Sequence, residues 1–260
     1  MKLAASQIAW TPEEEPNALG LLKQYGFCAI ETVPSRMQAG EAPYNAPQLA
    51  EKYAATMAAE HGLALCSMQG MWFGQSGSMF GKERAQLLEY TRKGILFAAA
   101  GGIGNLVFGN PKNRVLPAGQ DGSTAVDFFK QLGDFAAENG TVLALEANAA
   151  IYGTNFINET PEAFAMAERV DSLGCRVNLD TGTMIANQEK PACIAGKVYR
   201  INHVHISEPM LVQVQKRSLH KELYLMLKNE GYDRYISLEM KAQGLEVLER
   251  TLEYVAEVFA

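Results

Sequence analysis

The sequence predicts an α/β protein, a closed (β/α)8 barrel of the TIM-barrel type that spans residues 1–260 as one domain. Eight strand-like apolar runs alternate with eight helical segments, and a length of 260 residues is typical of this barrel. The segment Ile8-Ala9-Trp10-Thr11, at the end of the first strand-like run, lacks the glycine fingerprint of an open dinucleotide-binding sheet. No linker-like or low-complexity tract interrupts the alternation.

The predicted strands are short apolar runs bounded by turn residues. In chain order they cover residues 2–9, 27–33, 63–69, 105–110, 141–146, 175–180, 201–207 and 235–239. The predicted helices cover 13–25, 46–61, 82–100, 123–139, a segment that opens at Thr160-Pro161, a short piece near 191–196, 219–229 and 245–259. Thr160 is the expected N-cap of its helix, with Pro161 at the first helical position.

Composition narrows the classes of function. The net charge is −6 and no cluster of Lys and Arg occurs, which argues against a nucleic-acid partner. No apolar run reaches the length of a membrane span, and Glu13, Glu14 and Glu15 stand where a signal peptide would need its apolar core. The widely spaced Cys28, Cys66, Cys175 and Cys193 predict buried thiols in a reducing environment. We therefore expect a cytoplasmic protein.

Potential metal ligands stand at the ends of four consecutive predicted strands. The run 201–208 carries His203 and His205 in alternation, so both point to the same face. Glu146, Asp180 and Glu239 end the runs 141–146, 175–180 and 235–239. The intervals between Glu146, Asp180, His205 and Glu239 are 34, 25 and 34 residues, close to one strand-loop-helix-loop unit each. We expect these four side chains to meet at the carboxyl ends of the strands.

Three carboxylates and one imidazole form a hard, oxygen-rich ligand set. Such a set suits one divalent ion, Mn²⁺ or Mg²⁺, with Co²⁺ or Zn²⁺ as alternatives, although zinc would be expected to recruit more nitrogen or sulfur. Without a cation, the clustered carboxylates would repel one another and be partly protonated. The sequence therefore predicts a metal centre.

These motifs resemble a known group of proteins. The segments Leu145-Glu146, Leu179-Asp180-Thr181-Gly182, His203-Val204-His205 and Ser237-Leu238-Glu239-Met240 look like the signature of the sugar phosphate isomerase/epimerase family, the xylose isomerase-like barrels. The sequence is similar to ketose 3-epimerases, hydroxypyruvate isomerase, inosose dehydratase and, more distantly, endonuclease IV.

The resemblance implies that Glu146, Asp180, His205 and Glu239 bind one metal ion and that Glu146 and Glu239 are the catalytic acid/base pair. A ketose would bind the metal through its carbonyl and neighbouring hydroxyl oxygens. One glutamate would remove the proton beside the carbonyl to give an enediolate, and the other would return a proton on the opposite face. Members of the group often form dimers or tetramers, so the resemblance leaves open whether this chain forms a homo-oligomer.

Two positions depart from the family pattern. Thr183 stands where relatives commonly have a substrate-binding histidine, and Leu211 stands where epimerases of free ketoses tend to carry an arginine. Glu208 matches an acidic residue often found at that offset. The other candidates for substrate binding follow from their positions near strand ends and are His203, Thr183, Trp10, Gln69, Trp72 and Arg217, with Glu31 as a further hydrogen-bonding group. Trp10 and Trp72 could form an aromatic wall against a sugar. Lys112 and Arg114 in the loop 109–114 would lie over the mouth, where they could bind a phosphate, carboxylate or nucleotide on the substrate.

Several functions remain open at this point. An isomerase or a polyol dehydratase would use the same parts, and a non-catalytic sugar-binding barrel would not need two carboxylates beside an ion. A trinuclear zinc endonuclease needs more than the four histidines present, and an acidic chain fits DNA poorly. The sequence favours a metal-dependent sugar epimerase or isomerase with a small sugar as its partner.

Overall fold

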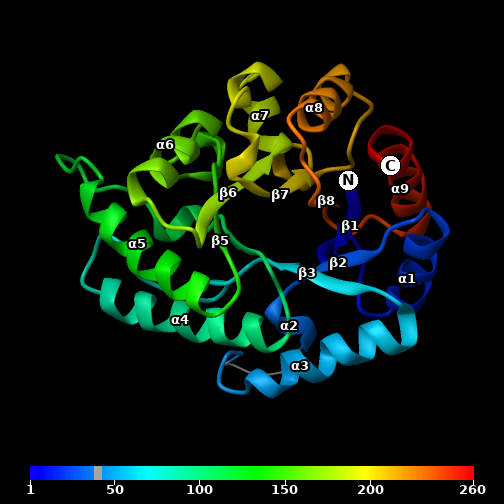
Figure 1. Ribbon diagram of the computed structural model, residues 1–260, viewed down its shortest axis with the longest axis horizontal. Coiled ribbons are helices and arrows are strands. Elements are labelled where there is room, and N and C mark those ends of the chain that lie inside the picture. Colours follow the sequence, from blue (N-terminus) through cyan, green and yellow to red (C-terminus); the bar gives the residue numbers. More distant parts are fainter. Residues whose placement is uncertain (38–42) are drawn as a thin grey trace.

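The computed structural model describes residues 1–37 and 43–260, and within them eight parallel strands close into a barrel in sequence order. Helices surround this barrel, and the view in Figure 1 looks onto the ring that they form. The predicted (β/α)8 fold is confirmed. The strands are β1 Lys2–Ser6, β2 Ala29–Thr32, β3 Ala64–Met68, β4 Leu106–Phe108, β5 Leu143–Glu146, β6 Cys175–Asp180, β7 Ile201–Ile206 and β8 Tyr235–Leu238.

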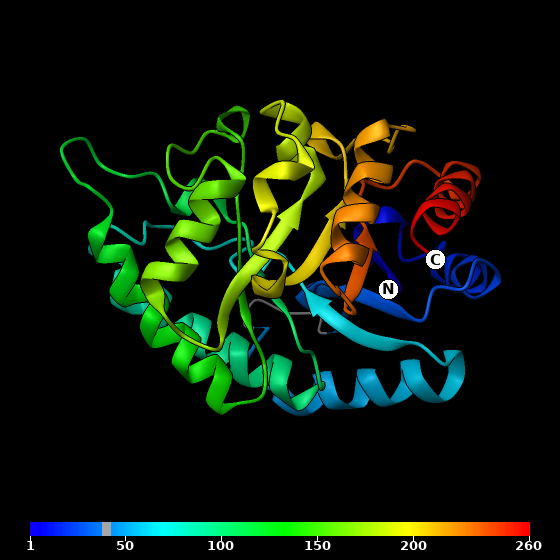
Figure 2. The same ribbon diagram turned by 45° about the horizontal axis from the view of Figure 1, so that its top comes forward.

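The helices cover the outside of the barrel, and turning the molecule shows them on the flank of the strands (Figure 2). Short 3₁₀ turns occur at several strand ends, and Met57–His61 forms a π-type turn after α3. The α-helices are α1 Glu15–Gln24, α2 Pro34–Met37, α3 Pro47–Thr56, α4 Arg84–Ala100, α5 Ser123–Glu138, α6 Thr160–Val170, α7 Thr181–Ala186, α8 Ser218–Asn229 and α9 Leu245–Phe259.

Some local predictions were wrong. The cap of α6 is Glu159, not Thr160, because Glu159 and Glu162 form a reciprocal capping box. The helix α7, which begins directly after Asp180, is not among the predicted helices, and residues 191–194 form only a 3₁₀ turn. Cys28 is exposed, whereas Cys66 and Cys175 are buried as expected, and the four cysteines are free.

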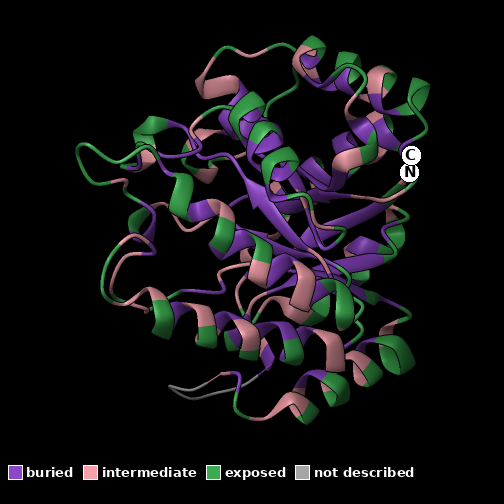
Figure 3. Cartoon of the chain, turned by 60° about the vertical axis from the view of Figure 1, so that its left-hand side comes forward, coloured by how far each residue is buried: buried purple, intermediate pink, exposed green. Residues whose placement is uncertain are grey.

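The burial pattern follows the layered architecture. Helices bury one side and expose the other, whereas the strands are buried almost throughout (Figure 3). Large apolar side chains such as Phe97, Phe128 and Phe164 fill the space between helices and strands. None of the helices in the described ranges is both long and apolar enough to span a bilayer.

Strand register brings polar side chains together inside the barrel. Glu146 is opposite Asn178, and Asp180 is opposite His205. On the other side, Glu31 is opposite both Ser6 and Ser67. Since registered residues on neighbouring parallel strands point the same way, the interior carries a column of polar groups that ends at the carboxyl ends of the strands.

Candidate active site

A cavity of about 200 Å³ opens at the carboxyl ends of the strands. Glu146, Asp180 and Glu239 line it, although each is less than a tenth exposed. The imidazole of His205 is fully buried below them. Its Nδ1 lies 2.9 Å from Glu146 Oε1 and 3.2 Å from Glu239 Oε2. The structure therefore brings together all four of the ligands that the sequence predicts.

Glu146 is held in place by two amides. Asn178 Nδ2 donates to its Oε1 at 2.8 Å, and Asn148 Nδ2 donates to its Oε2 at 3.0 Å. Gly109 lies so close that a Cβ at that position would overlap Oε2. The carboxylate of Glu146 therefore has a fixed orientation and no room to move toward β4.

Asp180 is fixed by the start of α7. Its Oδ2 accepts the Thr183 N–H at 2.7 Å as a helix cap, and its Oδ1 accepts the Ser207 hydroxyl. The hydroxyl of Thr183 donates to the Ala147 carbonyl at 2.9 Å. Thr183 is fully buried and positions Asp180 instead of presenting a group to the cavity.

His205 is oriented from behind by Glu31. The Glu31 carboxylate is fully buried, and its Oε2 lies 2.9 Å from His205 Nε2. Ser67 Oγ donates to the same oxygen at 2.7 Å, and Gln69 Nε2 donates to Oε1 at 2.9 Å. An ionised Glu31 accepts a hydrogen bond from Nε2–H and so fixes the tautomer at this end of the ring. The other nitrogen, Nδ1, faces the cavity carboxylates. A carboxylate behind a histidine is the usual support for a metal-binding imidazole.

Burial and neighbouring charges shift the pKa values of Glu239, Asp180 and His205. Burial raises the pKa of Glu239 to about 7, and the charges of Glu146 and Asp180 add to the effect against the opposing influence of His205. Burial, then the charge of Glu146, also raises the pKa of Asp180. Burial alone would lower the pKa of His205, but Glu239 and Glu31 raise it well above its usual value.

The donor set fits a divalent cation. One ligand atom each from Glu146, Asp180 and His205 lies within 4.8 Å of the others. Three buried carboxylates around one imidazole need positive charge, as the raised pKa values of Asp180 and Glu239 show. Oxygen-rich sets of this kind suit Mn²⁺ or Mg²⁺.

A second group of potential ligands, Glu31, His203 and His205, lies deeper in the barrel. His203 Nε2 is 3.5 Å from Glu31 Oε2, and the His203 ring is only 1% exposed. Burial lowers the pKa of His203 to about 3, so its ring is neutral. His203 borders a hollow with Lys2, Asp233 and Arg234 at the opposite end of the strands. His203 therefore lies one layer below the mouth. It was expected to bind substrate, but it does not line the cavity of the carboxylates.

The two tryptophans are packed inside the protein and do not form a wall of the cavity. Trp72 is 1% exposed, lies edge-on to Phe108 and Phe128, and donates its indole N–H to Thr91 Oγ1 at 2.8 Å. Trp10 is 2% exposed and its indole N–H points to Glu15 Oε2 at 3.3 Å. Both positions follow strands, but the sequence could not show on which side of the loop each ring would lie.

Other candidates pair with one another or are buried. Arg217 donates twice to Glu208 at 2.6 Å, so this ion pair stabilises the loop after β7, and neither residue is among the described residues that line the cavity. Arg114 does not reach over the mouth; it is fully buried and donates to the Glu146 carbonyl and Asn148 Oδ1, both at 2.8 Å. Of the expected substrate-binding residues, Gln69 lines the cavity.

Several residues of the site are not among those predicted from the sequence. Asn178 and Asn148 each stand two positions from a predicted ligand, and Ser207 follows His205 at the same spacing. The two-residue period of a strand was the signal that Asn178 shares a face with Asp180. The role of Glu31 depends on a contact across 174 residues, for which the sequence carries no local signal.

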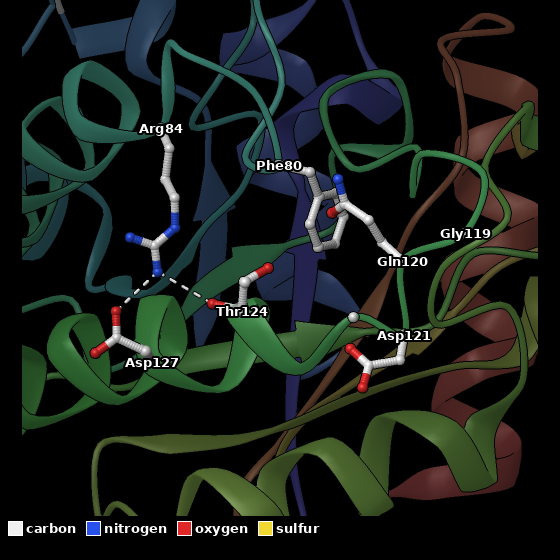
Figure 4. Close-up of a pocket in the computed structure, with 8 residues that line it drawn as sticks. Phe80, Arg84, Gly119, Gln120, Asp121, Thr124 and Asp127 are labelled. Atoms are coloured by element: carbon white, nitrogen blue, oxygen red, sulfur yellow. Dashed lines mark hydrogen bonds and ion pairs between the residues drawn. The ribbon is translucent and has the colours of Figure 1, made fainter.

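A wider hollow of about 750 Å³ lies on the outside, between α4 and the start of α5 (Figure 4). Its cation, Arg84, donates to Asp127 Oδ2 at 2.9 Å and to the Thr124 carbonyl at 3.0 Å. Arg84 and Asp127 pair with each other, Asp121 accepts the Ser123 N–H, and none of the residues that line this hollow lines the cavity of the carboxylates. This hollow therefore adds nothing to the chemistry of the carboxylates.

Comparison with known proteins agrees with this architecture. The model of the xylose isomerase-like TIM barrel family matches residues 19–258, so the chain belongs to that family. A search of curated proteins gives no match.

Solved structures share the fold at low sequence identity. D-psicose 3-epimerase from Clostridium cellulolyticum H10 superposes with a TM-score of 0.78 at 14% identity, covering 99% of this chain and 97% of that one. A 3-keto-D-glucoside 4-epimerase from E. coli gives 0.77 at 18% identity, covering 99% of both chains. A family 2 AP endonuclease from Brucella melitensis gives 0.75 at 19% identity, covering 100% of this chain and 99% of that one.

Proposed function

We propose that this protein is a divalent-metal-dependent sugar epimerase or isomerase that acts on a keto-sugar through an enediolate. The observation that carries the proposal is the placement of two glutamates, Glu146 and Glu239, at 2.9 and 3.2 Å from the same nitrogen of His205, at the edge of a cavity. With Asp180 they form a ligand set for one ion and leave carboxylate oxygens beside it. Mn²⁺ and Mg²⁺ suit these ligands best.

A bound divalent ion would polarise the ketone and the neighbouring hydroxyl group, which acidifies the C–H of the carbon that carries this hydroxyl, beside the carbonyl. One of the two glutamates removes the proton from that carbon, and the electron pair moves into the carbon–carbon bond. The other glutamate delivers a proton to the opposite face, which inverts the centre. Glu146 is fixed by Asn148 and Asn178, so its carboxylate keeps its direction throughout.

Delivery of the proton to the adjacent carbon would give isomerisation with the same residues. The structural relatives favour epimerisation: the names of two of them, a psicose 3-epimerase and a 3-keto-glucoside 4-epimerase, both place the inverted centre next to a ketone. An activity on DNA is disfavoured by a net charge of −6 and by only four histidines in the chain.

The test is proton exchange followed by NMR. The protein is stripped of metal, reloaded with Mg²⁺, and incubated in D₂O with D-psicose, D-fructose, a ketose phosphate and a 3-keto-D-glucoside. We expect deuterium at the carbon beside the carbonyl of at least one of these, with loss of exchange on chelation. Glu239→Gln should slow the exchange by about 10²- to 10⁴-fold. Glu222→Gln, on the exposed side of α8, is the matched control. Metal-loaded protein that exchanges none of these substrates would contradict the proposal.

A further inference from the structure

A second cavity of about 800 Å³ adjoins the cavity that the carboxylates line. The two cavities share Gln69, Gly70 and Leu211 as lining residues, so they lie side by side, and we call them the carboxylate compartment and the apolar compartment. The carboxylate compartment, at about 200 Å³, is below the range of roughly 300–1,000 Å³ that ligand pockets usually have. It has room for the reacting part of a substrate, while most of the available volume lies next door.

The lining of the larger compartment is apolar and aromatic. Tyr44 and Tyr90, beside α3 and on α4, pack with their ring centroids 5.0 Å apart. Tyr44 is only 3% exposed and its hydroxyl donates to the Met71 carbonyl at 2.8 Å, so it supports Tyr90, the partly exposed ring of the pair, from behind. Among the described lining residues, Lys241 is the one charged side chain, and it is exposed.

Phe73 stands at the rim of this compartment and is 89% exposed. Its ring therefore buries little apolar surface in the free protein. At the edge of an apolar compartment it is placed to cover a bound apolar group.

Leu211 separates the two compartments, and its backbone is held in an unusual conformation. Met210 and Leu211 have φ angles of +63° and +58°, which cost free energy for residues other than glycine. Hydrogen bonds hold the turn: Met210 N–H donates to the Tyr152 hydroxyl at 2.8 Å, and the Leu211 carbonyl accepts the Lys241 N–H at 2.9 Å. These hydrogen bonds keep the strained backbone in place, and the strained backbone places the Leu211 side chain between the two compartments.

We propose that the substrate is a keto-sugar with an apolar substituent of about the size of an aryl group, such as an aryl glycoside. The sugar ring lies in the carboxylate compartment, and the substituent passes Leu211 into the apolar compartment and packs on Tyr90 and Phe73. This substrate class rests on the proposed function and specifies it. A free ketose would leave the apolar compartment without contacts.

The test compares phenyl and methyl 3-keto-D-glucosides with Mg²⁺-loaded enzyme. Affinity is measured by calorimetry with the Glu239→Gln variant at a saturating Mg²⁺ concentration, because its exchange is expected to be about 10²- to 10⁴-fold slower, and deuterium exchange is measured with the wild type. We expect the phenyl compound to bind about tenfold or more tightly and to have a correspondingly higher kcat/KM. Phe73→Ala should reduce this phenyl-to-methyl ratio several-fold. Leu173→Ala, which removes an 83% exposed leucine far from the cavity, is the matched control for surface apolarity.

The readouts separate this inference from the proposed function. Exchange with either compound but equal affinity for both would overturn the apolar subsite and leave the epimerase proposal intact. A phenyl preference that depends on Phe73, without exchange of any substrate, would support the subsite and contradict the epimerase proposal. A phenyl-to-methyl ratio that is unchanged in Phe73→Ala would overturn the role of the rim.

Discussion

Glu31→Gln changes one charge behind the proposed metal ligand and almost no volume. In the wild type, the Glu31 carboxylate accepts from His205 Nε2 at 2.9 Å, and its pKa is lowered to about 2, since its ion pair with His205 outweighs the effect of burial. Glutamine at this position would favour an amide N–H directed at Nε2, which shifts the imidazole proton to Nδ1. That nitrogen faces Glu146 and Glu239, so the imidazole would present a proton where a ligand lone pair is needed.

The expected effect is a loss of about 10- to 100-fold in metal affinity, the usual result of removing the partner of a metal-binding histidine. The assay is calorimetric titration of metal-free protein with Mn²⁺ at pH 7.5. Glu222→Gln, an exposed glutamate on α8, is the control for loss of one negative charge. Thermal unfolding of each metal-free variant shows whether the fold is retained. A folded Glu31→Gln variant with a dissociation constant within about twofold of wild type would refute the reasoning.

Three further predictions concern neighbouring features of the site. The pKa of His205 is raised well above its usual value and that of Glu239 to about 7, so metal binding between pH 6 and pH 7 should release a proton from His205 and part of one from Glu239. The affinity for Mn²⁺ should therefore rise by about one to two orders of magnitude from pH 6 to pH 7, and a flat profile in calorimetry would exclude this linkage. Gly109→Ala should displace the Glu146 carboxylate and slow deuterium exchange by roughly 10- to 100-fold, and unchanged exchange would show that the close approach is unimportant. Trp72→Phe should lower the free energy of unfolding by about 1–3 kcal/mol in urea titrations without changing KM, whereas a raised KM would place the indole in the substrate site.

The sequence was sufficient for the fold and for the main ligands for one physical reason. In a parallel barrel, the side chain at the end of each strand points to the same mouth, so Glu146, Asp180, His205 and Glu239 could be placed together from spacing alone. The structure confirms the barrel and brings these side chains to one cavity. Their role in metal binding and catalysis remains a proposal.

The rest of the site depends on contacts that have no local signal. The aromatic rings of Trp10 and Trp72 point into the protein. Packing within the loops decides the direction of each ring, and the position of the residue after a strand does not. Arg114 is in a loop that reads as an exposed basic segment, yet its guanidinium is buried against the carbonyl end of β5. His203 shares a face with His205, but one layer lower it lies beyond the cavity that the carboxylates line.

The most direct test of the metal centre is a crystal structure of the Mn²⁺-loaded protein with anomalous diffraction. The account predicts one strong peak at the mouth of the barrel, bounded by Glu146, Asp180, Glu239 and the Nδ1 atom of His205. A peak at the deeper group, between Glu31, His203 and the Nε2 atom of His205, would contradict the account. The absence of any peak at the four mouth residues at a saturating Mn²⁺ concentration would also contradict it.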